Sequence, residues 1–251
     1  MPTVLPASPS GNASALPDDL LEALESARFG VEYEPLVELS SGQTVAFEGL
    51  ARFHRPDGSL MPPGPVFSRL HSAPALLVET ELAVKKLQVD HAPGHTLFVN
   101  LDPDSFASAP DGGAELLSVL GGIRRDVVVE AIENLDAGDA ERGQAMVAAL
   151  RARGFPFALD DVGASNSLIS FEMLAFADYF KFDRSILRRP RDARRLAAVE
   201  ALIAMAARTG ARTVLEGVES AADLDLARDL GIGLVQGHLF RDRFVSIRPP
   251  G

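Results

Sequence analysis

Short apolar runs recur along the chain, and almost every run ends on a polar side chain. The strings TVAFE, TLFVN, DVVVE, PFALDD, RTVLE and IGLVQ close on Glu48, Asn100, Glu130, the pair Asp160 and Asp161, Glu216 and Gln236. A further run, DYFKFD, carries Lys181 and Asp183. Runs that are apolar throughout are typical of strands buried on both faces of a parallel sheet. Between them lie stretches with helical patterning, for example residues 79–91, 141–154 and 191–210.

Glycines mark the passage from helix to strand. Gly154, Gly210 and Gly231 each follow an arginine-bearing segment and precede an apolar run, where a helix C-terminus favours a left-handed residue. Run ends lie about 20 to 50 residues apart, the repeat of a βα unit. Such units build an open doubly wound sheet or a closed barrel. No Gly-x-Gly-x-x-Gly turn follows an early strand, and polar residues close nearly every strand, which favours an α/β fold of the (β/α)8 barrel type.

Length and composition agree with one barrel. Such a barrel fills about 250 residues, and the chain has 251, of which 47% are hydrophobic and 24% charged. Residues 1–17, rich in Pro, Ser and Ala, are predicted to be a disordered tail, and residues 18–251 the barrel domain. At this length we expect no separate sensor domain. We therefore expect regulation through an unidentified protein partner, oligomerisation or expression.

Composition also argues against several classes of function. The chain has no cysteine, which excludes disulfides and thiolate metal sites. Its net charge of −11 argues against a nucleic acid polymer as partner. It has no secretory signal and no apolar stretch of roughly 20 residues, so we expect a cytoplasmic protein without a membrane partner. The arginine-rich segment from Arg184 to Arg195 suits a solvated helix start or a subunit contact, or alternatively a phosphate-binding strip.

The polar strand ends would bring five carboxylates beside one lysine, because strand ends converge on one site in a barrel. Hard divalent cations with oxygen ligands compensate such negative charge. Adjacent carboxylates such as Asp160 and Asp161 can serve two cations, and a two-metal centre hydrolyses phosphodiesters. Histidine ligands are not expected, since no histidine ends a strand. Each carboxylate alone could instead be a helix N-cap, Asp183 and Glu219 most simply, but the number of strands ending this way favours the metal site.

The blocks around these residues resemble the EAL family of cyclic di-GMP phosphodiesterases across residues 28–248. They read YEPLVELSSGQTVAFEGLARF, VNLDPDSF, VVVEAIEN, ALDDVGASNS, YFKFDRSIL, VLEGVES and LVQGHLF, in the family's order and spacing. The resemblance implies a modified TIM-like barrel whose first strand runs antiparallel to the others. It also implies hydrolysis of 3′,5′-cyclic di-GMP to linear pGpG with Mg²⁺ or Mn²⁺ at a two-metal site, and inhibition by Ca²⁺.

The resemblance gives a role to each matching residue. The metal ligands would be Glu48, Asn100, Glu130, Asp160, Asp161 and Glu216. The catalytic residues would be Glu48, Asp160, Asp161 and Lys181, with Lys181 near the attacking water. The ligand contacts would be Leu50 beneath the dinucleotide, Arg52 at a phosphate, Gln236 and Asp183. Glu133 and Glu219 would support the loop after the paired aspartates.

The resemblance also implies a possible homodimer. Family members often pair through the helices that follow the Asp-Asp and Lys-x-Asp strands. Here those helices include Leu196, Val199, Leu202, Ile203 and Met205. Packing on the barrel would also account for this apolar face, since every outer helix needs one.

Departures from the family pattern leave alternatives open. Gly49 replaces the usual alanine, Glu34 replaces a common glutamine, and the loop Gly163–Leu168 lacks a glycine, where Ser165 stands, an aromatic residue and a serine. Asn166, next to Ser165, tolerates positive φ better than most residues. A loop that holds the cations loosely would leave a receptor that binds cyclic di-GMP without efficient hydrolysis. A scaffold with neither property is a third alternative, against which the complete ligand set argues.

Overall fold

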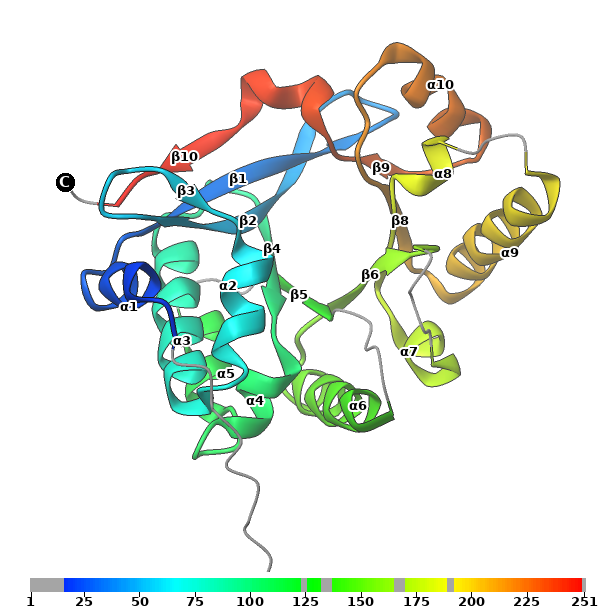
Figure 1. Cartoon of the computed structure of the whole chain (residues 1–251). Coiled ribbons are helices and arrows are strands. Elements are labelled where there is room, and N and C mark those ends of the chain that lie inside the picture. Colours follow the sequence, from blue (N-terminus) through cyan, green and yellow to red (C-terminus); the bar gives the residue numbers. More distant parts are fainter. Residues whose placement is uncertain (1–15, 123–125, 132–136, 165–169, 189–191, 250–251) are drawn as a thin grey trace, which may run out of the picture.

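The computed structural model describes residues 16–122, 126–131, 137–164, 170–188 and 192–249. The predicted disordered tail therefore lies outside the described residues, apart from Leu16 and Pro17. Among the described strands, eight close into a barrel with helices around it (Figure 1). The predicted α/β barrel is confirmed.

The barrel strands coincide with the apolar runs. They are β1 (Phe29–Glu38), β2 (Thr44–His54), β4 (Thr96–Leu101), β5 (Val127–Ala131), β6 (Phe157–Val162), β7 (Tyr179–Phe182), β8 (Arg212–Leu215) and β9 (Leu234–Val235). From β2 through β9, each strand pairs in parallel with the next one of the ring. In contrast, β1 pairs antiparallel with both β2 and β9 and closes the ring. The antiparallel first strand is confirmed.

Two short strands extend the sheet beyond the ring. β3 (Leu60–Met61) pairs antiparallel with β2, and β10 (Val245–Ile247) pairs antiparallel with β1. β10 brings the C-terminal end of the chain beside the first barrel strand (Figure 1). This placement lets Ser246 Oγ of β10 donate a hydrogen bond to Glu32 Oε2 of β1.

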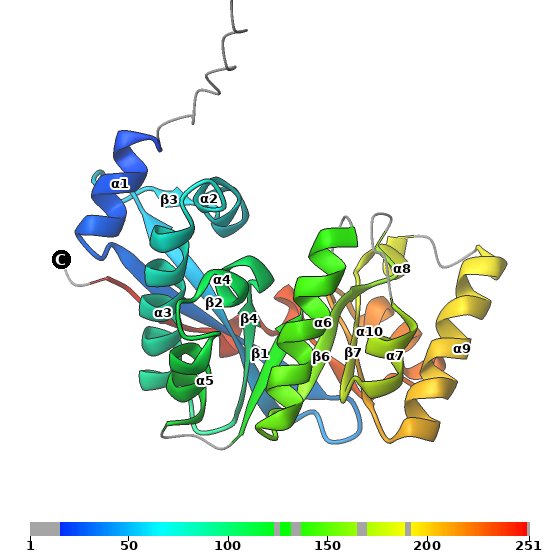
Figure 2. The same cartoon turned by 90° about the horizontal axis from the view of Figure 1, so that it is seen from below.

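The helices lie outside the ring and return the chain between parallel strands (Figure 2). They are α1 (Asp18–Glu25), α2 (Pro63–Leu70), α3 (Pro74–Asp90), α4 (Pro103–Ser108), α5 (Ala114–Gly121), α6 (Ala137–Ala152), α7 (Phe171–Phe176), α8 (Ser185–Arg188), α9 (Ala193–Thr209), α10 (Ala221–Asp229) and a 3₁₀ helix at His238–Arg243. The three stretches with helical patterning fall on α3, α6 and α9. None of the helices in the described part of the chain has the length and apolarity needed to cross a bilayer.

The glycines at the helix ends adopt the predicted conformation. Gly154, Gly210 and Gly231 have φ of 76°, 80° and 74°. A left-handed residue lets the chain turn away from the helix, and glycine adopts it without a steric penalty. Each of these turns leads directly into a barrel strand.

Side chains of the barrel strands alternate between the interior and the surrounding helices. One buried cluster comprises Leu36, Ala46, Phe98, Val128, Ala158, Val214 and Leu234 and fills the interior. Outward residues such as Leu97 and Val99 join the larger cluster under the helices. In each parallel strand that contributes to the interior cluster, the residue two positions further along is polar: Glu48, Asn100, Glu130, Asp160, Glu216 and Gln236. Because strand side chains repeat with a period of two, these polar groups stand directly above the apolar layer.

The apolar face of α9 is used largely by the barrel. Val199 is buried, and Leu202 and Ile203 pack against the outer core. Barrel packing therefore accounts for these residues, and the homodimer stays a prediction.

Gly237, which follows the site residue Gln236, offers a test of the close packing at the end of β9. Its φ is 152°, and an added Cβ would overlap the backbone of Val218. We expect Gly237→Ala to lower the free energy of unfolding by more than about 2 kcal/mol, because it forces two hydrogen-bonded segments apart. Thermal denaturation measures this loss. Gly233→Ala is the control, since its Cβ would lie 3.7 Å from the nearest atom, Thr213 O; equal losses in both variants would contradict the expectation.

Candidate active site

Lys181 lies at the centre of the barrel mouth. β7 places its side chain there, and the residue is 1% exposed. Its Nζ lies 2.6 Å from Glu130 Oε1, 2.7 Å from Glu216 Oε1, 3.1 Å from Asp160 Oδ1 and 3.3 Å from Glu48 Oε2. Burial alone would lower the pKa of Lys181, but these carboxylates raise it well above its ordinary value. Lys181 is therefore an ammonium that forms ion pairs with carboxylates from four other strands or strand ends.

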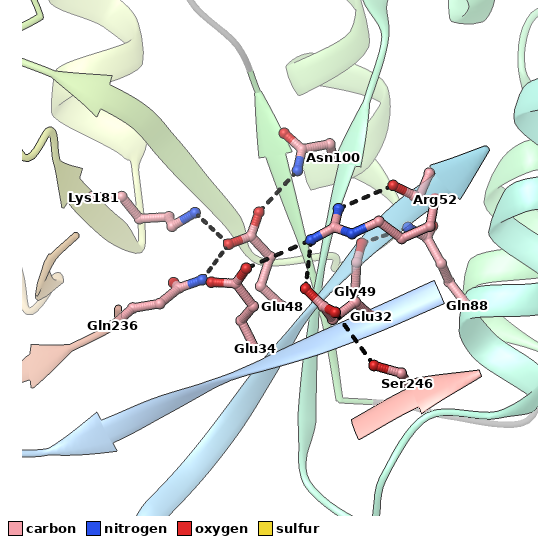
Figure 3. Close-up of polar contacts among 11 residues, drawn as sticks. Glu32, Glu34, Glu48, Gly49, Arg52, Gln88, Asn100, Lys181, Gln236 and Ser246 are labelled. Carbon is pink, nitrogen blue, oxygen red and sulfur yellow. Dashed lines mark hydrogen bonds and ion pairs between the residues drawn. The ribbon is translucent and has the colours of Figure 1, made fainter. Parts of the chain in front are cut away.

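Glu48 is the second centre of contacts. Its Oε1 accepts a hydrogen bond from Asn100 Nδ2 at 3.1 Å, and its Oε2 accepts one from Gln236 Nε2 at 2.6 Å (Figure 3). Burial would raise the pKa of Glu48, but Lys181 and the hydrogen bond from Gln236 hold it below its ordinary value. Glu48 is thus kept as a carboxylate within this network.

One ammonium does not neutralise the surrounding carboxylates. Burial raises the pKa of Glu130 well above its ordinary value, and the nearby Glu48 adds to the shift. Burial also raises the pKa of Glu216 to about 8, although Lys181 opposes the shift. Burial, together with the charge of Asp160, raises the pKa of Asp161 to about 6. The raised pKa values of these carboxyl groups therefore favour protonation within the cluster.

Buried oxygen atoms without a donor indicate which ligand would complete the site. Within the described residues, Glu130 Oε2 and Gln236 Oε1 are buried and receive no hydrogen bond. Buried polar atoms are normally paired, and carboxylate and amide oxygens suit Mg²⁺ and Mn²⁺. These carboxylate and amide oxygens therefore form a set of ligand atoms that fits hard divalent cations. The residues that could hold them are Glu48, Asn100, Glu130, Asp160, Asp161 and Glu216.

A cavity of about 340 Å³ opens above the charged cluster. Its walls include the predicted residues Glu48, Leu50, Asp160, Asp161, Asp183, Glu216, Glu219 and Gln236, together with Glu34, Arg184 and His238. A second cavity of about 240 Å³ has mainly apolar walls, and Leu50 borders both cavities. Asn100 borders the second cavity, whereas Glu130 is fully buried.

The backbone turns sharply after the paired aspartates. Asp161 has φ of 53° and Gly163 has φ of 89°. Arg195 of α9 donates to Gly163 O at 2.5 Å and also to Ser185 Oγ of α8. The turn that directs Asp161 is therefore tied to two outer helices. The loop residues Ser165 and Asn166 and the predicted loop support Glu133 lie outside the described residues.

A family model for the EAL domain matches residues 18–242 of this chain. The chain belongs to the EAL domain family. It is 27% identical over 234 residues to cyclic di-GMP phosphodiesterase NbdA, and 27% identical over 236 residues to the bifunctional diguanylate cyclase/cyclic di-GMP phosphodiesterase MucR, both of Pseudomonas aeruginosa. These alignments cover 89% and 88% of this chain but 30% and 34% of the two relatives. The EAL domain thus spans about a third of the length of these curated relatives.

Solved EAL structures share the barrel. A structure described as PaMucR phosphodiesterase, c-di-GMP complex, superposes with a TM-score of 0.72 at 26% identity, over 87% of this chain and 93% of that one. The Klebsiella pneumoniae BlrP1 manganese/cy-diGMP complex at pH 6 gives a TM-score of 0.69 at 24% identity, over 87% of this chain and 61% of that one. The present EAL domain therefore has a TIM-like barrel with one antiparallel strand.

Two of the predicted carboxylates differ in their local role. Asp183 makes a contact of the kind that the N-cap alternative expects, because its Oδ1 accepts a hydrogen bond from Ser185 N, the first residue of α8, at 2.8 Å. The N-cap alternative is wrong for Glu219: the N-cap of α10 is Ser220, which forms a capping box with Asp223. Both Asp183 and Glu219 nevertheless line the cavity.

Arg52 lies at the edge of the network rather than among its centres. Its Nη2 is 2.8 Å from Glu32 Oε1 and 3.6 Å from Glu34 Oε1 (Figure 3). Burial raises the pKa of Glu34, and the nearby Glu48 adds to the shift. Crowding does not require a glycine at position 49, within the family signature, since a Cβ added to Gly49 would lie 3.4 Å from its nearest neighbours.

Five of the described lining residues were not predicted as site residues, and three of them, Glu34, Arg184 and His238, carry polar side chains. Glu34 lies on β1, two positions before the interior Leu36, and the antiparallel direction of β1 places it at the mouth. Arg184 follows Asp183 directly, and His238 follows Gly237 after the short strand β9. The reversed direction of β1 is the signal that could have identified Glu34.

The raised pKa values predict how the metal-free EAL domain responds to pH. With a pKa of about 8 at Glu216 and about 6 at Asp161, the folded state binds more protons than the unfolded chain at neutral pH. Stability then falls as pH rises. We expect the melting temperature of EDTA-treated protein to fall between about pH 6 and about pH 8, and Mn²⁺ to raise it more at the higher pH.

Calorimetry at fixed ionic strength measures both effects. Glu216→Gln removes one of the titrating groups and should flatten the pH dependence. A metal-free melting temperature that rises with pH across this window would contradict the assignment.

Proposed function

We propose that this EAL domain hydrolyses 3′,5′-cyclic di-GMP to linear pGpG in the presence of Mg²⁺ or Mn²⁺. The observation that carries the proposal is the set of carboxylates around Lys181, with buried oxygens that lack donors, beneath a cavity open to a ligand. Relatives named as cyclic di-GMP phosphodiesterases support the choice of reaction.

The metal ligands in this proposal are Glu48, Asn100, Glu130, Asp160, Asp161 and Glu216. Divalent cations, when bound at such a site, activate water as the nucleophile and neutralise charge on the phosphate. Lys181 keeps the ligand carboxylates together and stabilises negative charge near the attacking water. Protons bound to the carboxyl groups of Glu216 and Asp161 would be released when cations bind. Ca²⁺ is expected to occupy the site and inhibit, because its larger and more flexible coordination positions a water less strictly.

The remaining predicted residues hold the dinucleotide in this proposal. Leu50, which borders both cavities, would pack beneath it. The guanidinium of Arg52 would bind a phosphate, a role that suits its planar fork. Gln236 and Asp183 would help to place the ligand, and Glu133 and Glu219 would support the loop.

A receptor that binds cyclic di-GMP without efficient hydrolysis is the second candidate. Arg52 is held by two carboxylates, and the loop after Asp161 departs from the family sequence. Tight binding of cyclic di-GMP with no pGpG after long incubation with Mn²⁺ would favour this alternative.

The decisive assay incubates the purified protein with cyclic di-GMP and Mn²⁺ and follows pGpG by chromatography. We expect product that disappears with EDTA or with Ca²⁺. Glu48→Ala should abolish turnover, because it removes a metal ligand and the acceptor for Asn100 and Gln236. Glu38→Gln is the matched control, since Glu38 lies at the far end of β1 beside Arg212 and should leave activity unchanged. Robust turnover by Glu48→Ala would reject the proposed role of Glu48.

Location and assembly accompany the proposed function as predictions. The cytoplasm is the expected location, and a homodimer through α7 and α9 is the expected assembly. On α7, Phe171 is 82% exposed and Phe176 is 44% exposed, which supplies apolar surface for such a contact. Light scattering should give twice the 26.7 kDa mass of the chain, and Phe171→Glu should return it to one chain. A single-chain mass for the unchanged protein would reject the dimer.

A further inference from the structure

Two acidic side chains of β1 face the arginine that would bind the ligand phosphate. Glu32 and Glu34 are two residues apart and therefore lie on the same face of β1. The antiparallel register sets Glu32 opposite Leu50 and Glu34 opposite Glu48, so that face meets the face of β2 that carries Arg52 (Figure 3). Arg52 thus stands beside two carboxylates before any ligand arrives.

The two carboxylates are not equivalent. Glu32 Oε1 accepts a hydrogen bond from Arg52 Nη2 at 2.8 Å, and Glu32 Oε2 accepts one from Ser246 Oγ of β10 at 3.3 Å. Glu34 Oε1 lies 3.6 Å from the same Nη2, beyond the range of a good hydrogen bond. Glu34 also lines the cavity above the metal ligands, whereas Glu32 is not among the residues described as lining it. Glu32 is therefore the fixed partner of Arg52, and Glu34 is the partner at the ligand side.

A phosphate that approaches Arg52 from the cavity meets Glu34 first. Two anions that compete for one guanidinium repel each other, and each weakens the attraction available to the other. Arg52 stands behind Glu34, 3.6 Å from its Oε1, and is not among the residues that line the cavity. The guanidinium in the described cavity wall is that of Arg184, which follows β7 on the opposite side of the ring from β2. The carboxylate at position 34 thus lowers the affinity of the cavity for anions in proportion to their charge.

We propose that Glu34 is a specificity-determining residue that discriminates between dinucleotides by their negative charge and favours release of the hydrolysed product. The inference rests on the proposed function. Hydrolysis adds water, breaks one P–O bond and leaves a hydroxyl and a terminal phosphate. The cyclic dinucleotide carries two negative charges, and the terminal phosphate adds roughly one more to the product near pH 7. Glu34 therefore penalises pGpG more than cyclic di-GMP.

Glu34→Gln tests this discrimination, because it removes the charge and keeps the shape of the side chain. Isothermal titration with Ca²⁺ in place of Mn²⁺ measures affinity for cyclic di-GMP and for pGpG separately. We expect binding of cyclic di-GMP to tighten by about threefold and that of pGpG by about tenfold, as fits one like charge removed from a partly screened site. Under turnover conditions, the variant should show stronger inhibition by added pGpG.

Glu38→Gln is the matched control, since it removes the same charge from the same strand but beside Arg212. It should leave both affinities unchanged. Weaker binding of either dinucleotide by Glu34→Gln would overturn the inference, because it would mean that the carboxylate itself accepts hydrogen bonds from the ligand. Equal gains for both dinucleotides would also overturn it. If the unchanged protein and both variants bind neither dinucleotide, the proposed function fails and this inference fails with it.

Discussion

The structure depends on one ammonium held among carboxylates in the mouth of the barrel. Lys181 lies within 3.3 Å of oxygens from four acidic side chains and is almost fully buried. Removing such charges from water costs more than simple pairing returns, so a buried cluster of this kind contributes little to stability by itself. The apolar layer beneath it supplies the hydrophobic core that the charged layer does not. In the proposed function, the charged layer holds cations and is not a source of folding free energy.

The reversed first strand determines how charge is distributed around this cluster. In the parallel strands, the polar residue follows the interior apolar residue by two positions, as Glu130 follows Val128. In β1 the order is inverted, and Glu34 precedes Leu36. Because β1 pairs with both β2 and β9, its acidic side chains stand between Arg52 on one side and Gln236 on the other. The strand that closes the barrel thus adds negative charge beside Arg52, the counter-ion of a phosphate in the proposed function.

This inversion also explains which parts of the site the sequence could predict. Apolar runs that end on Asn100 or Glu216 predict both a strand and the position of its polar residue. The polar residue lies two positions after an interior apolar residue, so both side chains point to the same face of the strand. This rule applies only to the C-terminal ends of strands. It therefore does not identify Glu34, which precedes the interior residue of its strand. Arg52 illustrates a second limit: the resemblance places its guanidinium at a ligand phosphate, but the sequence does not show that Glu32 and Glu34 lie beside it. Glu219 illustrates a third, since a capping residue and its neighbour look alike until the backbone shows that Ser220 takes the cap.

Charge balance links cation binding to ligand binding at this site. The described walls of the larger cavity carry seven carboxylates, from Glu34, Glu48, Asp160, Asp161, Asp183, Glu216 and Glu219, against the guanidinium of Arg184 and the buried ammonium of Lys181. A dianionic ligand entering this cavity without cations would meet net repulsion, whereas bound divalent ions would reverse the sign of the field it meets. The coupling is reciprocal, because a ligand that binds better to the cation-loaded site also strengthens the binding of the cations. In the proposed function, affinity for a phosphodiester and affinity for metal are therefore coupled at this cavity, and the turn from Asp161 to Gly163 that Arg195 ties to the outer helices would contribute to both.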